Sequence, residues 1–437
     1  MNISTKQIIA SIAIGIVIAI TSSSLYMVNT GDYYRSIFPF IDNINQFTKD
    51  IPQSFPLKPE IDSIFSYDYI SSYSYLVYTY AIIISFFTDH FSLSLYSSIL
   101  KVIYICIITF LFFKLNKNNN KLITAAAYLL SLLPIISSSN LAFFGSFYQE
   151  QVLMIFIPLF ILSTFKDNIL NILIAFISIT VIACSKSQFF YIPIIAIAYY
   201  CLFNRGQIFI KLPLMIISLV MAIFCIIAAT STVTYNKYHS EYFGIYEYER
   251  LNGIVLPDGV DESCVGIDAW GNRFDTSKGV TQTDIGEKCF NQHVDANFKN
   301  SLSEFIKHPS IIFMLPFDSG VKSQLTENYF HVYKAMDLII NNKGFYYQLT
   351  LMKDYLFKDY RFLILLASLI LSLSFRKNEL SGLLFIVSTI GCSQFYMAFF
   401  GEGYRDMSKH LFGMNFSFDL LLFVSIIYIF RFSCKSK

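Results

Sequence analysis

The sequence predicts a mainly α-helical, polytopic membrane protein with a small periplasmic domain. Of its 437 residues, 55% are hydrophobic and only 14% are charged, whereas a soluble globular domain carries about 25% charged residues. About ten apolar runs approach the roughly 20 residues that a membrane-spanning helix needs. The net charge of +2 does not indicate nucleic acid as a partner, and Lys and Arg lie in short clusters of the kind that set membrane topology.

The first apolar run, residues 8–28, follows Lys6 and predicts an uncleaved signal anchor with a cytoplasmic N-terminus. A polar loop, residues 30–92, then lies in the periplasm. Residues 73–87 within this loop are apolar, but they are short and rich in Tyr and Ser. If they were counted as a span, the basic residues 114–121 would lie on the periplasmic side, against the bias of Lys and Arg toward cytoplasmic loops. We therefore expect an amphipathic helix on the periplasmic surface of the membrane.

The remaining spans complete a transmembrane module, residues 1–231, and a C-terminal part, residues 361–437. In the first module they are expected at 93–113, 122–136, 152–165, 169–184, 189–203 and 212–230. In the C-terminal part they are expected at 361–375, 380–400 and 411–430, with a periplasmic loop at 401–410. Lys114, Lys166 and Arg205 then share the cytoplasmic side, as the bias of Lys and Arg requires. The long polar segment, residues 232–360, is the predicted periplasmic domain.

The cysteines divide between apolar and polar segments. Only Cys264 and Cys289 of the eight lie in the polar segment 232–360. An isolated pair in a segment that faces an oxidising compartment predicts one disulfide. No CxxC or Cys/His spacing indicates zinc, and no metal ligands are predicted.

Polar groups gather at three places that this topology puts on one side of the membrane. They are Asp32 and Arg35 after the first span, residues 146–151 with Glu150, and the loop 401–410. The loop contributes Glu402, Arg405, Asp406, Lys409 and His410. Because ionisable groups in hydrocarbon are costly and are kept for function, these residues are candidate site residues, together with Asp419 near the middle of the last span.

Simpler interpretations of the same residues stay open. Asp32 alone is also typical of an anchor at the membrane interface. Lys409 and His410 are also typical of residues that end a span by snorkelling, and Arg405 with Asp406 is also consistent with a local ion pair of little consequence.

The chemistry that fits these groups is transfer from an anionic lipid donor. A carboxylate can accept a proton from an acceptor hydroxyl, while Arg, Lys and His hold a phosphate leaving group. Lys101, inside its span, is expected to snorkel outward to the same phosphate. The chain has no Gly-rich nucleotide loop, so a soluble nucleotide sugar is not expected as the donor.

Longer stretches of the chain are also distinctive. They are Tyr67–Tyr75, Ser146–Gln151, Gly266–Asn272, Glu327–Tyr333, Gly401–Asp406 and His410–Met414. Together they closely resemble the serotype-specific glucosyltransferases of temperate-phage O-antigen modification clusters, and the resemblance covers nearly the whole chain. It implies a GT-C-type membrane glycosyltransferase, with seven spans before the periplasmic domain and interfacial helices in the first outer loop.

The resemblance implies the reaction as well as the fold. The donor would be glucose carried on undecaprenyl phosphate and the acceptor an O-antigen repeat of lipopolysaccharide. Transfer would take place on the periplasmic side of the bacterial inner membrane. A companion flippase and a glucosyl-lipid synthase would supply the donor.

A mechanism by single displacement with inversion follows for the candidate residues. Asp32 stands where that family keeps its catalytic acid and would be the base, while Glu150 would position sugar or acceptor. The phosphate-binding residues would be Arg405, Lys409, His410 and Lys101. Many GT-C enzymes carry an acidic pair after the first span, but here Tyr33 follows Asp32. This departure leaves Asp42 and Asp68 as competing bases and gives no support for a divalent metal cofactor.

Other classes of function remain as alternatives. An O-antigen polymerase or a lipid-linked sugar flippase would also present a charged periplasmic loop. Transporters, however, carry broken helices and polar mid-membrane residues in both halves, whereas Asp419 is nearly alone here. A receptor or structural protein would use residues 232–360 to bind a ligand and would not depend on Asp32 or Glu150.

Overall fold

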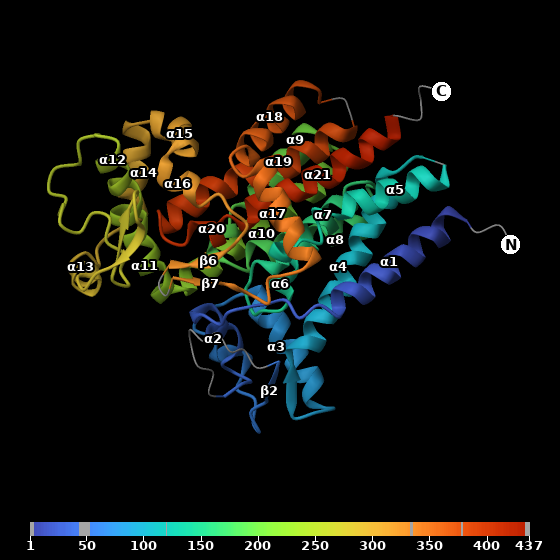
Figure 1. The fold of residues 1–437 in the computed structure, drawn as a ribbon, viewed down its shortest axis with the longest axis horizontal. Helices are drawn as coiled ribbons and strands as arrows, with labels where there is room; N and C mark the ends of the chain where they lie inside the picture. Colours follow the sequence, from blue (N-terminus) through green and yellow to red (C-terminus); the bar gives the residue numbers. More distant parts are fainter. Residues whose placement is uncertain (1–3, 43–52, 119, 333–334, 377–378, 433–437) are drawn as a thin grey trace.

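The computed structural model describes residues 4–42, 53–118, 120–332, 335–376 and 379–432. Helices dominate the fold: apolar helices form an elongated bundle, a group of shorter helices gathers at one end of it, and the first polar loop lies below it (Figure 1). Figure 1 also shows that α1 (Thr5–Thr21) begins and α21 (Phe412–Phe432) ends at the opposite end of the bundle. The predicted mainly helical architecture is confirmed.

Each predicted span overlaps a helix of the bundle, but the bounds differ; the first helix ends at Thr21, whereas the first span was predicted to end at residue 28. The bundle helices are α1 (Thr5–Thr21), α4 (Leu93–Leu115), α5 (Lys121–Leu132), α7 (Gln151–Ser163), α8 (Ile169–Ala183), α9 (Ile192–Leu202), α10 (Ile208–Ala228), α18 (Arg361–Ser374), α19 (Glu379–Glu402) and α21 (Phe412–Phe432). Within the described residues, α4, α10, α19 and α21 are long and apolar enough to cross a membrane, and the others are shorter apolar helices. The total of ten spans therefore stays a prediction.

Polar capping residues set the starts of several apolar helices. Ser4 and Gln7 form a capping box at α1, in which each side chain accepts a hydrogen bond from the other's backbone N–H. Asn120 caps α5 and Asn168 caps α8 through their side-chain oxygens. These caps satisfy N–H groups that have no partner inside the helix, so each apolar run begins as a helix at a defined residue.

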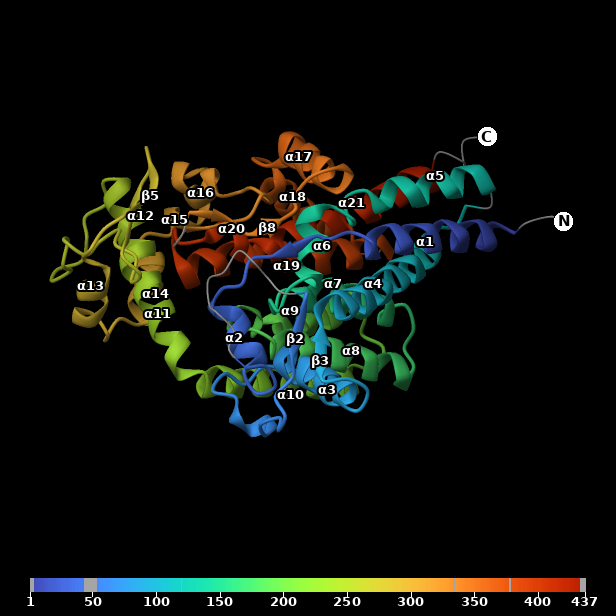
Figure 2. The same cartoon turned by 60° about the horizontal axis from the view of Figure 1, so that its bottom comes forward.

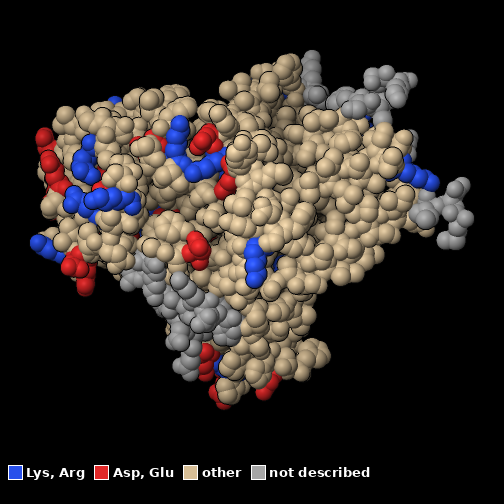
Figure 3. All heavy atoms as spheres, in the orientation of Figure 1, with Lys and Arg blue, Asp and Glu red and all other residues tan. Residues whose placement is uncertain are grey.

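The two ends of the bundle differ in the residues that they carry. In the α4–α5 turn, Asn118 donates to the carbonyl of Phe430 near the end of α21, at 3.4 Å. Lys211 on α10 pairs with Asp167 before α8 at 2.6 Å. On the face in Figure 3, most charged side chains lie toward the end away from α5, and much of the bundle surface is uncharged. Such a surface suits contact with lipid.

The first polar loop folds back against the bundle. In this loop β1 (Tyr26–Met27) pairs antiparallel with β8 (Ile339–Ile340), α2 (Gly31–Ile37) follows, and β2 (Ser54–Pro56) pairs with β3 (His90–Ser92). Next to α2 lies α3 (Ser72–Ser85), which buries Val77 and Ala81 and exposes Leu76 and Ile83. This helix covers the residues of the predicted interfacial helix, and its position at the membrane surface stays a prediction. Residues 43–52 of the loop lie outside the described residues.

Residues 230–323, here called the outer region, form the end of the molecule beyond the bundle (Figure 1). They contain α11 (Thr230–Ser240), a π-helical turn η3 (Glu241–Ile245), α12 (Tyr246–Leu251), the hairpin β4 (Asn272–Asp275) and β5 (Gly279–Gln282), α13 (Gly286–Gln292), α14 (Phe298–Lys307), α15 (Ser310–Met314), η4 (Leu315–Phe317) and α16 (Ser319–Ser323). The predicted disulfide between Cys264 and Cys289 is present, with the two Cα atoms 5.5 Å apart.

The rest of the polar segment 232–360 packs into the bundle, which its composition did not indicate. β6 (Phe330–His331) pairs with β7 (Met336–Asp337), and α17 (Phe345–Phe357) packs against α6 (Ser138–Phe144). Lys353 of α17 lies 2.6 Å from Asp419 of α21. One hydrophobic cluster therefore continues from the bundle into the outer region.

Candidate functional site

Segments from both ends of the chain meet where the bundle joins the outer region. α2 and α20 (Met407–His410) lie at this junction (Figures 1 and 2). The backbone of loop 401–410 docks on η3: Tyr404 donates its N–H to the carbonyl of Phe243 at 3.0 Å. Gly403 has φ +59°, and a Cβ there would lie 2.5 Å from the Cα of Gly244. Only glycine allows so close a backbone approach.

We call the charged side chains at this junction the ionic cluster. Its members that the sequence predicted are Asp32, Arg35, Glu402, Arg405, Asp406, Lys409 and His410. The structure brings these residues together although Asp32 and Lys409 are 377 positions apart.

Asp32 lies in the first turn of α2 between two cations. Its carboxylate is 2.7 Å from the guanidinium of Arg35 and 2.9 Å from the ammonium of Lys409. Burial alone would raise the pKa of Asp32, but Arg35, Lys409 and Lys186 outweigh it and hold the pKa well below its usual value. Since 19% of its side chain remains exposed, Asp32 is an ionised carboxylate that solvent can reach.

Lys409 links two carboxylates and an aromatic ring. Besides Asp32, its ammonium lies 3.8 Å from Asp406 and 4.8 Å from the centre of the Tyr148 ring. Tyr148 is itself held by hydrogen bonds of 2.8 Å with the hydroxyl of Thr30 and the carbonyl of Val28. Burial opposes a charge on Lys409, yet Asp32 and Asp406 raise its pKa. Lys409 is therefore a buried, positioned cation.

Arg405 is held by Glu402, which the sequence predicted, and by Asp268, which it did not. Its Nε lies 3.2 Å from Asp268 and its guanidinium 3.5 Å from Glu402. The buried ring of His239 bridges the same two carboxylates, at 2.9 Å from Asp268 and 3.3 Å from Glu402. Burial would raise the pKa of Asp268, but Arg405 and His239 lower it to about 2. Asp268 lies in the distinctive stretch Gly266–Asn272, so the sequence could have indicated it as a candidate site residue. No sequence pattern indicated His239.

Asp406 is the least compensated carboxylate of the cluster. Its φ of +46° is unusual for a residue with a side chain, and its Oδ1 has no hydrogen-bond partner among the described residues. Its Oδ2 lies 3.8 Å from Lys409 and 4.0 Å from His331. Burial raises the pKa of Asp406 to about 7, and Lys409 and Arg405 offset only part of this effect.

His410 is a hydrogen-bonding group in this arrangement. Its ring nitrogens lie 3.7 Å from Glu402 and 3.4 Å from the side-chain oxygen of Gln188. Burial and the nearby Lys186 lower the pKa of His410 well below its usual value. The ring is therefore neutral at pH 7, and it can offer an N–H to a phosphate but not a full charge.

Glu150 lies beside the ionic cluster, paired with a Lys that sequence reasoning did not select. Its Oε1 is 2.6 Å from the ammonium of Lys186, and both side chains are buried. Its Oε2 has no hydrogen-bond partner among the described residues. Lys186 is close enough to Asp32 to lower the pKa of that carboxyl, so the pair borders the same space as the cluster.

Other predicted site residues lie apart from the cluster. Lys101 donates to the carbonyl of Ile20 at 3.1 Å and to Ser23, just after α1. Asp419 contacts Lys353 and, at 2.7 Å, the amide of Asn140 inside the bundle.

The two competing bases both lie at the surface. Asp42 is mostly exposed and lies 3.6 Å from Lys58. Asp68 is exposed between Tyr67 and Tyr69, which point inward. Neither carboxylate shares the environment of Asp32.

Comparison with known proteins identifies the family. A family model described as the YfdI N-terminal transmembrane domain matches residues 2–437. The chain is 44% identical over 414 residues to the uncharacterized protein YfdI of Escherichia coli (strain K12), which covers 95% of this chain and 93% of that protein. No solved structure matches the chain significantly. The chain therefore belongs to the YfdI N-terminal transmembrane domain family.

Proposed function

We propose that this chain transfers a glucosyl residue from undecaprenyl-phosphate-glucose to O-antigen repeats on the periplasmic side of the bacterial inner membrane. The observation that carries the proposal is the 2.9 Å contact between Asp32, after the first apolar helix, and Lys409, between the last two. It sets a solvent-accessible carboxylate beside cations at the end of a membrane bundle. Proton acceptance and phosphate binding need such an arrangement, and the resemblance of the chain to phage-type glucosyltransferases supports this reaction.

The proposed reaction is a single displacement at the anomeric carbon. The acceptor oxygen forms a bond to that carbon while its O–H bond breaks and the proton passes to the carboxylate of Asp32. The bond from the anomeric carbon to the phosphate oxygen breaks at the same time, and the lipid phosphate leaves with the electron pair. Arg405 and Lys409 bind its developing charge, while neutral His410 donates an N–H.

Lys409 couples donor binding to the strength of the base. In the structure its ammonium contacts Asp32 and helps to lower the pKa of that carboxyl. A donor phosphate competes for the same ammonium and adds negative charge nearby, and both effects raise the pKa of Asp32. The base thus gains proton affinity when the glucosyl donor is in place.

The residues around Arg405 act as positioning groups. Asp268, Glu402 and His239 surround its side chain, so the guanidinium is oriented before a phosphate arrives. Glu150 has one oxygen paired with Lys186 and one without a partner among the described residues. The second oxygen is available to a sugar hydroxyl.

The test is O-antigen analysis by NMR in a host that expresses the chain with or without its glucosyl-lipid synthase. One new glucosyl signal per repeat, dependent on the synthase and lost in Asp32→Asn, is the expected result. Asp68→Asn is the matched control because this carboxylate is exposed and lies outside the cluster. Longer O-antigen without a new sugar would indicate a polymerase, and donor lipid that crosses the membrane without transfer would indicate a flippase.

A further inference from the structure

We propose that Glu249, Glu304 and His308 form a divalent-cation site in the outer region, suited to a transition metal such as Zn²⁺. One carboxylate oxygen of each Glu and one ring nitrogen of His308 all lie within 4.8 Å of one another. Glu249 comes from α12, whereas Glu304 lies on α14 and His308 directly follows it. The spacing of four residues puts Glu304 and His308 on the same side of α14.

A second observation, independent of this spacing, is the state of Glu249. Its side chain is completely buried, and neither carboxylate oxygen has a hydrogen-bond partner among the described residues. A buried carboxylate without partners is strongly disfavoured. The nearby ammonium of Lys307 contacts Glu304 at 2.7 Å from a side chain that is 56% exposed, and it gives Glu249 no hydrogen bond. A cation between Glu249 and Glu304 supplies the missing partner.

The ligand set indicates the kind of cation. Imidazole favours zinc and its neighbours in the transition series over Ca²⁺ and Mg²⁺, and carboxylates complete such sites. Three protein ligands leave one position of a tetrahedral ion for water. Glu304 also lines a polar cavity of about 380 Å³, together with Glu241, Asp258 and Asp295. These carboxylates attract cations to the cavity, which reaches the proposed site at Glu304.

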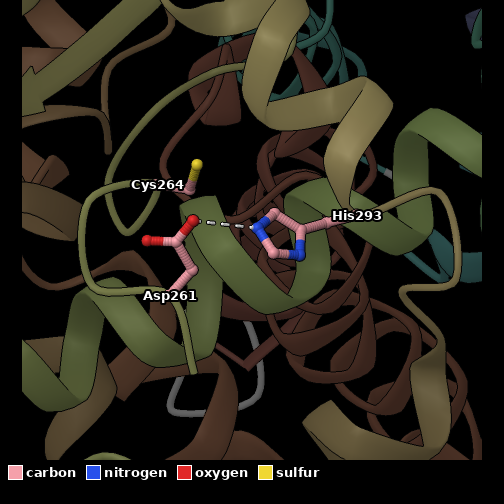
Figure 4. Close-up of side chains that lie close together, drawn as sticks. All are labelled: Asp261, Cys264 and His293. Carbon is pink, nitrogen blue, oxygen red and sulfur yellow. Dashed lines mark hydrogen bonds and ion pairs between the residues drawn. The ribbon is translucent and has the colours of Figure 1, made fainter. Parts of the chain in front are cut away.

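A second group with similar ligand spacing lacks free ligands. Figure 4 shows Asp261, Cys264 and His293, whose ligand atoms also lie within 4.8 Å of one another. The sulfur of Cys264 is bonded to Cys289 and cannot bind a metal as thiolate. The ring of His293 contacts Asp261 at 3.3 Å and the hydroxyl of Tyr242 at 3.0 Å. This group therefore provides a matched control.

A cation at this site would join two helices that support the ionic cluster. The ring centres of Tyr248 on α12 and Phe305 on α14 lie 6.4 and 6.5 Å from that of Phe399 on α19. Phe298 of α14 stacks on Phe400 at 5.4 Å. Glu402 follows these two residues at the end of α19. The site therefore predicts a gain in stability on metal binding, whatever reaction the cluster performs.

The experiment uses the full chain, purified in detergent with a tag that contains no histidine. The protein is stripped with EDTA and incubated separately with Zn²⁺ and Ca²⁺, and bound metal is measured by mass spectrometry after gel filtration. We expect about one Zn²⁺ per chain and little Ca²⁺, together with a Zn²⁺-dependent rise in Tm. Glu249→Gln and His308→Ala should each weaken Zn²⁺ binding at least about tenfold, while His293→Ala should retain it.

The outcomes separate the proposal from its alternatives. Wild-type protein that takes up no Zn²⁺, or His308→Ala protein with wild-type Zn²⁺ affinity, overturns the site. Loss of Zn²⁺ in His293→Ala assigns the metal to the other group and also overturns it. Bound Zn²⁺ without a change in Tm refutes the link between the helices. If Glu249→Gln fails to fold, the His308→Ala variant decides whether the site exists, because His308 is only half-buried. Elution as a single species and formation of the disulfide show that this variant has folded.

Discussion

Replacement of Lys353 by Met tests whether the buried charges of the bundle stabilise the fold. Lys353 lies 2.6 Å from both Glu327 and Asp419, and Arg361 lies 2.8 Å from Glu327 and 2.7 Å from Asp354. Three carboxylates and two cations give this network a net charge of −1. Lys353→Met changes it to −2, whereas Asp419→Asn changes it to zero. The two variants remove partners of the same contact but have opposite effects on the charge balance.

The expected losses of stability differ for this reason. Lys353→Met leaves Asp419 buried with the amide of Asn140 as its remaining partner in the network. Breaking a buried pair in this way costs about 3–5 kcal/mol. Asp419→Asn keeps a hydrogen-bonding side chain and leaves Lys353 paired with Glu327, so it should cost about 1 kcal/mol. A double variant with Met and Leu should recover much of the loss, because apolar replacements of buried pairs are often neutral.

Gel filtration after heating measures these differences in Tm. For a chain of this length, we expect Lys353→Met to lower Tm by about 5–10 °C and Asp419→Asn by about 1–2 °C. Lys343→Met, which alters an exposed Lys, is the control for loss of a positive charge. A Tm for Lys353→Met equal to that of the control, or a lower Tm for Asp419→Asn than for Lys353→Met, would refute the charge argument.

Further predictions concern the junction and the outer region. Asp32→Asn should lower glucosylation about 10²–10⁴-fold at unchanged expression, and fully modified O-antigen would exclude Asp32 as the base. Arg405→Ala should abolish glucosylation and Arg405→Lys should restore only part of it, because an ammonium cannot keep both carboxylate contacts; full activity of the Ala variant contradicts the phosphate role. The pKa of Asp406 is raised to about 7, so between about pH 4 and 7 the folded chain holds a proton that the unfolded chain has lost, and stability from this group falls as pH rises. Asp406→Asn should therefore flatten the decrease in Tm between pH 5 and pH 8, and an unchanged pH dependence would refute this. Replacing Cys264 and Cys289 by Ser should cost about 3–4 kcal/mol, seen as a lower Tm, whereas thiol labelling of both residues in unreduced wild-type protein would contradict the disulfide.

The features that could be predicted from the sequence are those that depend on the exclusion of charged residues from the hydrocarbon core of the membrane. Long apolar runs located the bundle helices, and a charged loop between two such runs located part of the ionic cluster. Asp32 joined the candidate list because it follows the first run directly. The disulfide followed from counting cysteines in polar segments. Each of these inferences needs only local composition and the physics of the membrane.

The remaining contacts depend on pairings between distant segments, which composition does not report. Asp419 had no visible partner because Lys353 lies in a segment that looked external, yet α17 inserts beside α21. Lys101 was expected to extend outward, but the end of α1 offers it carbonyl groups within 3.1–3.4 Å. His239 could not be predicted as a site residue, because a single His in a polar segment is common and does not by itself indicate a function.

The contact between Asp32 and Lys409 also has a consequence for the synthesis of the chain. The two residues are separated by 377 positions. In the same way, β1 can pair with β8 only after β8 has been synthesised. At about 5–20 residues per second, a ribosome needs about 20–75 s to pass from one residue to the other. During that time Asp32 has Arg35 as a cationic partner but still lacks Lys409. Assembly of the junction therefore begins only after Lys409 has been synthesised, and we expect the two parts of the chain to associate when they are expressed as separate polypeptides.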